Sequence, residues 1–181
     1  LDHLVGSTVA PLIVAFVEAP QGTQQAEHGG EKTPDYVRML ADEVVPVLEG
    51  TYRIRAESGS HGIIGIGGGA LTAAYAAAER PDVFGKAGGF SFYLSNPEAP
   101  LLAEAISAGG DGKKASFWIT WNRYELKRAE WNVDLGRDSR RVAEMLESAG
   151  FTVVRKEALD SAGWGGWRVR TGEILEQMFP R

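Results

Sequence analysis

The chain has 181 residues, enough for one domain with a substantial hydrophobic core and short for two. Hydrophobic residues make up 44% and charged residues 24%, as in an ordinary globular protein. The net charge of −5 argues against nucleic acid as a partner, and the absence of cysteine excludes disulfides and thiolate chemistry. We therefore expect a single domain over residues 1–181.

The longest apolar run, residues 9–17, contains a proline and is too short to span a bilayer, so we expect no membrane partner. There is no secretory signal, and the lack of cysteine is compatible with the cytoplasmic location that we expect. Nothing in the sequence indicates a cofactor or a metal site.

The first predicted element is a buried strand at residues 11–17, a continuous apolar run rich in branched side chains. A long polar loop follows at residues 18–32. Thr33 and Pro34 have the residue types of a helix start, and apolar residues then recur at helical spacing. Pro46 is expected to kink this helix near its end.

The remaining pattern alternates strands and helices. Residues 63–64 form a short strand, residues 65–69 a glycine turn, and residues 70–80 a helix of mostly small side chains. Further strands are predicted at 87–92, 116–121 and from 152, and further helices at 100–108, 138–149 and 167–179. This alternation predicts an α/β layered domain with a mostly parallel sheet.

The glycine turn is the most informative motif. An α/β-hydrolase presents its nucleophile between a strand and a helix in the form Gly-x-Ser-x-Gly. Here the corresponding residues are Gly65-Ile66-Gly67-Gly68-Gly69, so the nucleophile position, Gly67, has no side chain.

With the segments around it, this motif resembles the family of "putative esterases" related to enterochelin esterase and esterase D, within the α/β-hydrolase superfamily. The resemblance extends over nearly the whole chain. The segments that carry it are residues 33–46, the pair Tyr52-Arg53, residues 80–87, the pair Phe90-Ser91, residues 121–125 and residues 160–164. It implies a three-layer α/β-hydrolase-like sandwich.

Carried over residue by residue, the resemblance places the nucleophile at Gly67, the triad acid at Glu125 and the base at Ala162, with an oxyanion amide at Gly68. Acyl transfer by this route needs an oxygen nucleophile and a base that a third group orients. Since only Glu125 keeps a functional group, no intact triad is present and ester hydrolysis is not expected.

The resemblance also implies that strands preceding residues 11–17 are missing from this chain, which would be N-terminally incomplete. One of them would lie between residues 11–17 and 63–64, and its end would supply half of the oxyanion hole. We therefore expect either a complementary N-terminal polypeptide or a homo-oligomer to cover the open sheet.

The leading hypothesis is a degenerate, non-hydrolytic esterase that binds a small ligand or a partner chain at the former active-site cleft. Trp121, Tyr124, Ser161 and Trp164 are candidates for lining a ligand site, although plain packing also explains the aromatic residues. Glu125 is a candidate acid or base for a non-esterase reaction.

Two alternatives stay open. The chain can derive from an active carboxylic-ester hydrolase that engineering has inactivated or that another chain completes. The turn between Gly65 and Ala70 also fits the dinucleotide fingerprint Gly-x-Gly-x-x-Gly/Ala and can hold a nucleotide or a phosphate. The acidic residue expected about twenty residues later is absent from the end of the next strand.

Overall fold

The structure is a computed structural model that describes residues 3–18, 22, 24–94, 100–108, 115–161 and 163–181. Its centre is a four-stranded sheet in which every neighbouring pair is parallel and the strand order is β1-β2-β3-β6. The strands are β1 (Gly62–Ile66), β2 (Lys86–Phe90), β3 (Ser116–Tyr124) and β6 (Thr152–Ser161). The predicted α/β class with a parallel sheet is therefore confirmed.

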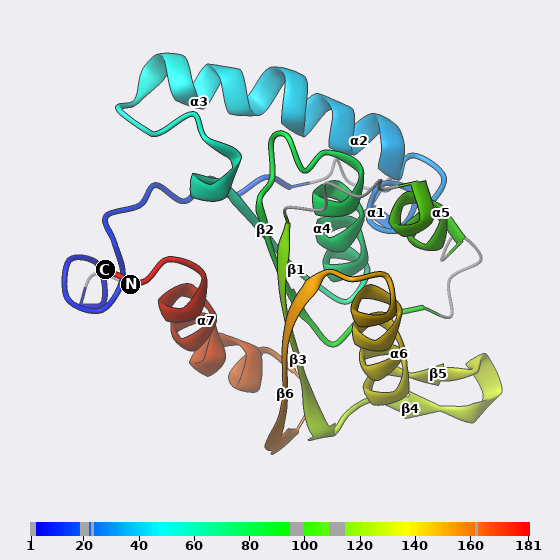
Figure 1. Cartoon of the computed structure of the whole chain (residues 1–181). Coiled ribbons are helices and arrows are strands. Elements are labelled where there is room, and N and C mark those ends of the chain that lie inside the picture. The colour runs from blue at the N-terminus through cyan, green and yellow to red at the C-terminus, as the bar shows by residue number, and fades with distance from the viewer. Residues whose placement is uncertain (1–2, 19–21, 23, 95–99, 109–114, 162) are drawn as a thin grey trace.

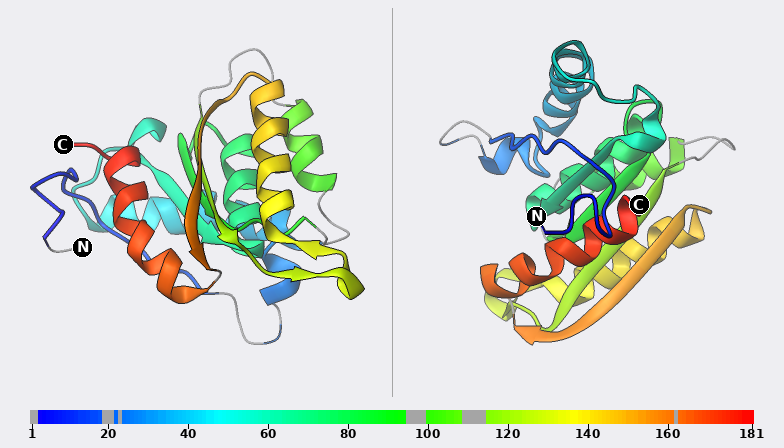
Figure 2. Two further views of the ribbon diagram at one scale, coloured as in Figure 1. Left: turned by 90° about the horizontal axis from the view of Figure 1, so that it is seen from below. Right: turned by 90° about the vertical axis from the view of Figure 1, so that its left-hand side faces the viewer.

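Three helices connect the strands and cover one face of the sheet, while the last helix covers the other (Figures 1 and 2). The connecting helices are α4 (Gly68–Glu79), α5 (Pro100–Ala108) and α6 (Leu135–Ser148), and the last helix is α7 (Trp164–Met178). The main hydrophobic core lies between the sheet and the connecting helices, and a smaller cluster around Phe90, Ile174 and Met178 lies beneath α7. This gives three layers.

Helix α4 lies at the centre of the domain, as its small side chains predict. Every residue from Ala70 to Ala78 is buried. Because six of these nine side chains are methyl groups, the helix axis can approach the sheet closely, and α4 contacts both β1 and β2.

The predicted helix around residues 33–51 forms with one irregular turn. It consists of α2 (Thr33–Met39), a π-helical turn (Leu40–Val44) and α3 (Val45–Thr51). Pro46, the second residue after this turn, has no amide hydrogen to donate, which explains why the regular hydrogen-bond pattern breaks here. A short helix, α1 (Gln24–Glu27), lies within the predicted loop.

Several boundaries differ from the predictions. Helix α6 starts at Leu135, three residues early, because Asp134 caps it by accepting a hydrogen bond from the Arg137 amide at 2.9 Å. A small hairpin of β4 (Lys127–Arg128) and β5 (Val133–Asp134) was not predicted. Short 3₁₀ helices form at Ser58–Ser60 and Ala129–Trp131.

The strand predicted at residues 11–17 does not form, and this prediction was wrong. The segment is extended but lies outside the sheet, and Ile13, Val14, Phe16 and Val17 are exposed. It is anchored at its start by the Ala10 amide, which donates to the Phe179 carbonyl at 2.9 Å. The branched side chains favour an extended backbone, but a strand also needs a neighbour to pair with, and no described strand pairs with this segment.

Strand β1 forms one edge of the sheet, with no strand beyond it among the described residues. Its sequence, Gly-Ile-Ile-Gly-Ile, carries no charge and no proline, the devices that usually protect an edge strand from pairing with another chain. The extended segment 11–17 passes on this side of the sheet in both views of Figure 2. No described strand is hydrogen-bonded to this edge.

Candidate functional site

The candidate site lies at the carboxyl ends of the parallel strands, where ligands bind in open α/β sheets. Strand β1 ends at Ile66 and α4 begins at Gly68, so Gly67 alone forms the turn between them. Its backbone angles are φ 59° and ψ −117°, and its amide donates to the Phe90 carbonyl at 2.9 Å. This is a sharp strand-to-helix turn of the kind that presents a nucleophile, with a positive φ that residues other than glycine rarely adopt.

The neighbouring glycines permit close approach of two backbones. A Cβ atom on Gly65 would lie 2.0 Å from the Gly69 carbonyl oxygen, and a Cβ on Gly68 would lie 2.5 Å from the His28 carbonyl oxygen. By contrast, a Cβ on Gly67 would meet no described atom within 4 Å. The turn therefore has space for a side chain at the one position from which the nucleophile would project.

A buried hydrogen-bond network lies beside this turn, at the end of β2. The Ser91 hydroxyl donates to Glu125 Oε1 at 2.5 Å and accepts from the Trp167 indole nitrogen at 2.9 Å. The backbone amide of Asn122 also donates to Glu125 Oε1, at 2.7 Å. Ser91 is fully buried and has a positive φ of 53°, an uncommon value for a residue other than glycine.

This network connects Glu125 to the turn, because Ser91 follows the residue that accepts the Gly67 amide hydrogen. The second carboxylate oxygen of Glu125 is buried and has no hydrogen-bond partner among the described residues. The Ser91 proton is directed to this carboxylate, so Glu125 holds Ser91 in place. Sequence reasoning did not identify the contribution of Ser91 and Trp167.

His28 also lies near the turn, which the sequence did not indicate. Its Nδ1 is 3.7 Å from the position that a Cβ on Gly69 would occupy, and its ring packs at 5.1 Å between centroids against Tyr36. Burial lowers the pKa of His28, although Glu27 acts in the opposite direction, and burial raises the pKa of Tyr36. The imidazole is therefore neutral at physiological pH.

The other predicted site residues are not all brought together. Ala162 lies outside the described residues, so its predicted role stays a prediction. Ser161, Tyr124 and Trp164 are exposed, with Ser161 and Tyr124 paired in the β3–β6 register. Trp164 packs edge to face with Trp167 at 5.5 Å between centroids, which places it next to the Ser91 network.

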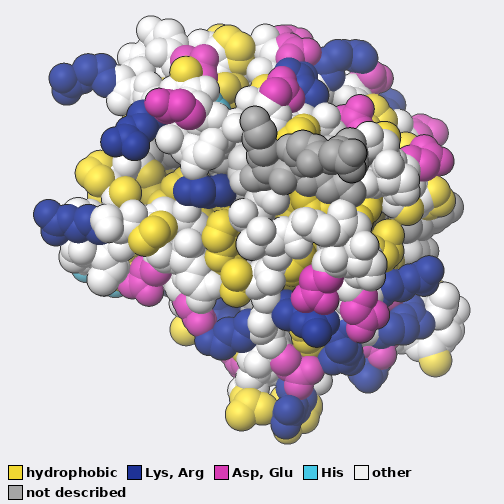
Figure 3. Space-filling model, in the orientation of Figure 1, with side chains coloured by type: hydrophobic (Ala, Val, Ile, Leu, Met, Phe, Trp, Pro, Cys, Tyr) yellow, Lys and Arg dark blue, Asp and Glu magenta, His cyan; other side chains and the backbone are white. Residues whose placement is uncertain are grey.

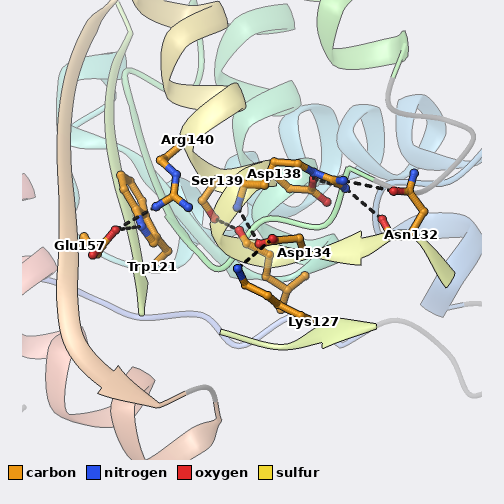
Figure 4. Close-up of polar contacts among 10 residues, drawn as sticks. Trp121, Lys127, Asn132, Asp134, Asp138, Ser139, Arg140 and Glu157 are labelled. Atoms are coloured by element: carbon orange, nitrogen blue, oxygen red, sulfur yellow. Dashed lines mark hydrogen bonds and ion pairs between the residues drawn. The ribbon is translucent and has the colours of Figure 1, made fainter. Parts of the chain in front are cut away.

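Trp121 is separated from this group by its burial. Its indole nitrogen donates to Glu157 at 3.0 Å, and the Arg140 guanidinium lies 5.7 Å from its ring centroid (Figure 4). Arg123 and Arg140 also bind Glu157 and lower the pKa of that carboxyl group. Trp121, which belongs to β3, thus packs against Glu157 on β6 and Arg140 on α6 and is not available to line an open site.

The turn is part of neither of two hollows described here. One cavity of about 20 Å³ lies between α7 and strands β3 and β6, and a shallow groove of about 440 Å³ lies between α5 and α6. Gly67 lines neither of them. Strand β1 is the edge strand among the described residues, and the His28 backbone lies beside the turn, with its carbonyl oxygen 2.5 Å from the position of a Cβ on Gly68.

Three further observations concern metal ligands, membrane-spanning helices and surface charge. Within the described residues, no group of three or more His, Cys, Asp or Glu side chains is placed to hold a metal ion. In that same part of the chain, no helix has the length and apolar character needed to cross a membrane. The face in Figure 3 mixes acidic and basic side chains without a large region of one sign.

Comparison with known proteins gives a family and a fold. The model of the family described as "Putative esterase" matches residues 10–151. No curated protein matches the sequence.

Solved structures with similar folds include S-formylglutathione hydrolase from Staphylococcus aureus, with 15% identity, a TM-score of 0.65 and coverage of 85% of this chain and 63% of that one. An enterobactin esterase from Shigella flexneri has 16% identity, a TM-score of 0.65 and coverage of 80% and 38%. A ferulic acid esterase has 14% identity, a TM-score of 0.64 and coverage of 80% and 60%. The chain thus spans less than two thirds of each of these proteins.

Proposed function

Because the chain belongs to the putative esterase family and has an α/β-hydrolase-type fold, we propose that it is a degenerate member that binds a small ligand without covalent catalysis. The observation that carries this proposal is the geometry of Gly67. The turn keeps the backbone conformation and the open space of a nucleophile position, but the residue there supplies only a hydrogen atom.

The groups around the turn support ligand binding. Gly68 is the first residue of α4, so its amide hydrogen has no partner within the helix and lies at the positive end of the helix dipole. A backbone amide N–H only donates hydrogen bonds, so this one can bind the carbonyl oxygen of a ligand. Trp164 and Tyr124 add exposed aromatic surface nearby, so an ester or acid with an aromatic group fits this surface.

Ethyl benzoate tests this proposal because it offers a carbonyl oxygen, an aromatic ring and an ester bond. We expect saturable quenching of tryptophan fluorescence, with the ester recovered intact. Trp164→Ala should weaken binding about tenfold, which is the loss of a typical aromatic contact of about 1.4 kcal/mol. The matched control is Trp131→Ala: Trp131 is 70% exposed and Trp164 is 76% exposed, but Trp131 lies on the β4–β5 hairpin.

Hydrolysis of an ester through a covalent intermediate is the result that would contradict this proposal. A burst of p-nitrophenol from p-nitrophenyl acetate, equal in amount to the protein and lost in Glu125→Gln, would show that a covalent acyl intermediate forms and would end the proposal. Mass spectrometry of the intact chain identifies such an adduct directly. If hydrolysis instead appears only in the double variant Gly67→Ser, Ala162→His, the lost side chains are the reason for inactivity.

The open edge of β1 supports a second proposal, that a second copy of the chain covers it. The extended segment 11–17 is suited to pair as a strand with β1 of another copy, because it is apolar and pairs with no described strand. Its Phe16 side chain is 90% exposed. Exposed apolar surface of this kind is uncommon in monomers. In such a dimer, the segment of one copy would lie along β1 of the other.

Sedimentation equilibrium tests the second proposal. We expect a dimer that Phe16→Lys dissociates by raising the dimer Kd at least tenfold, because a charge would have to be buried in the contact. Val47→Lys is the matched control, since Val47 is an exposed apolar residue on α3, away from the sheet edge. A chain that stays monomeric at all concentrations would refute the second copy and leave a complementary polypeptide as the partner to be sought.

A further inference from the structure

The contact between α7 and the sheet has an apolar half and a polar half. Towards the carboxyl end of the helix, Ile174 and Met178 pack with Phe90 in the smaller hydrophobic cluster. Towards its amino end, Arg170 is turned to the sheet and is only 6% exposed. A buried guanidinium needs hydrogen-bond partners and a countercharge. The polar half of the contact is therefore stable only if the groups around Arg170 supply both.

Arg170 is poorly satisfied by the protein. Its nearest carboxylate is that of Asp160, at 3.5 Å from Nη1, and this side chain is about half exposed. Its Nε and Nη2 are buried without a hydrogen-bond partner among the described residues. The hydroxyl of Thr120, on β3, is also buried without one. Leaving such donors unpaired costs more than an ordinary hydrogen bond returns, so an occupant that accepts hydrogen bonds is favoured.

A cavity lies where these groups meet. Thr120 and Arg170 both line the cavity of about 20 Å³ between α7 and strands β3 and β6, and Trp118 and Ile174 provide apolar walls. Lys156 and Glu173 line it too, but they are paired with each other. The volume suits one atom-sized guest, either a water molecule or a small anion.

We propose that this cavity binds a single small anion of the size of chloride, held by Arg170 and Thr120. The unpaired nitrogen atoms of Arg170 can only donate hydrogen bonds, which matches a guest that only accepts them. A water molecule would bring two hydrogen atoms of its own that need acceptors, and it would add no negative charge beside a guanidinium whose ion pair, with the half-exposed Asp160, is 3.5 Å long.

The anion connects to the candidate site through α7. Trp167 is one turn before Arg170 on this helix, and its indole nitrogen donates to the Ser91 hydroxyl. An anion that fixes Arg170 against β3 therefore also fixes the helix turn that covers the Ser91–Glu125 pair. This inference does not depend on the proposed ligand, because it concerns a different cavity and can be tested without any ester.

Thermal unfolding at constant ionic strength tests the anion site, with sodium chloride compared against sodium gluconate, whose anion is too large to enter. We expect chloride to raise the Tm of the unmodified chain by about 2–4 °C, increasing with concentration as binding to the folded state requires. Arg170→Met should abolish the difference between the two salts. Arg168→Met is the matched control, because Arg168 is exposed on the same helix, and it should keep the difference.

Two further measurements keep the test decisive if Arg170→Met does not fold. Thr120→Val preserves the shape of the side chain and should reduce the chloride effect at least twofold. Crystals soaked in sodium bromide should show an anomalous peak in the cavity. Equal Tm values in chloride and gluconate, or a water molecule in the cavity in place of bromide, would overturn the proposal.

Discussion

Alanine at position 65 is expected to be the most damaging single substitution in the strand-to-helix turn. The new Cβ would lie 2.0 Å from the Gly69 carbonyl oxygen and 2.6 Å from the Ala70 amide nitrogen, both backbone atoms of α4 that cannot move aside without shifting the helix. Overpacking of a well-packed region typically costs about 1–3 kcal/mol of unfolding free energy. The cost here should reach the upper end of this range, because the Cβ meets backbone atoms and not a flexible side chain. We expect Gly65→Ala to lose at least that amount of unfolding free energy in urea.

Gly50→Ala is the control for the glycine substitution itself. Gly50 lies in α3, and a Cβ there would meet no described atom within 4 Å. Since alanine is the better helix former, this variant should be as stable as the parent or gain up to about 1 kcal/mol. A Gly65→Ala chain as stable as Gly50→Ala would show that β1 and α4 are further apart than described.

Phe117→Ala is expected to have the second large effect. Phe117 is 1% exposed on β3 and packs edge to face with Phe151, with 5.2 Å between ring centroids. Removing a buried phenyl ring leaves a cavity and costs about 3–5 kcal/mol. The loss would appear as a lower urea midpoint with an unchanged slope, because the surface exposed on unfolding stays nearly the same.

Phe16→Ala provides the comparison, because this ring is 90% exposed on the segment before α1. It should change the unfolding free energy by no more than about 0.5 kcal/mol, measured in dilute protein so that contact between copies does not contribute. Equal losses in the two phenylalanine variants would contradict the placement of Phe117 in the main core.

Local sequence patterns were sufficient to predict the elements whose partners follow directly in the chain. The strand, glycine turn and small-residue helix between residues 62 and 79 were predicted because strand and helix are consecutive and pack on each other. The prediction for residues 11–17 failed because an apolar, branched run shows only that a segment can pair. Whether a neighbouring strand exists is a long-range property that the run itself does not contain.

The candidate site was predictable only where a motif marks it. The resemblance pointed to Gly67 and Glu125, whose roles stay predictions; the Gly67 amide donates to the Phe90 carbonyl, and Ser91, the next residue, donates to Glu125. The hydroxyl that connects them, from Ser91, and the indole that covers it, from Trp167, are 76 residues apart in the chain, so no spacing reveals them. Trp121 was assigned to the site because it is aromatic, but it is buried in the main hydrophobic core and its hydrogen-bond partner, Glu157, lies 36 residues later.

The order of the strands along the sheet also bears on how this chain is made. Because β1, β2, β3 and β6 are neighbours in the sequence in which they leave the ribosome, each new strand and helix can add to a platform that already exists. Among the described strands, addition proceeds away from β1, so its far edge gains no partner from any described strand that is synthesised after it.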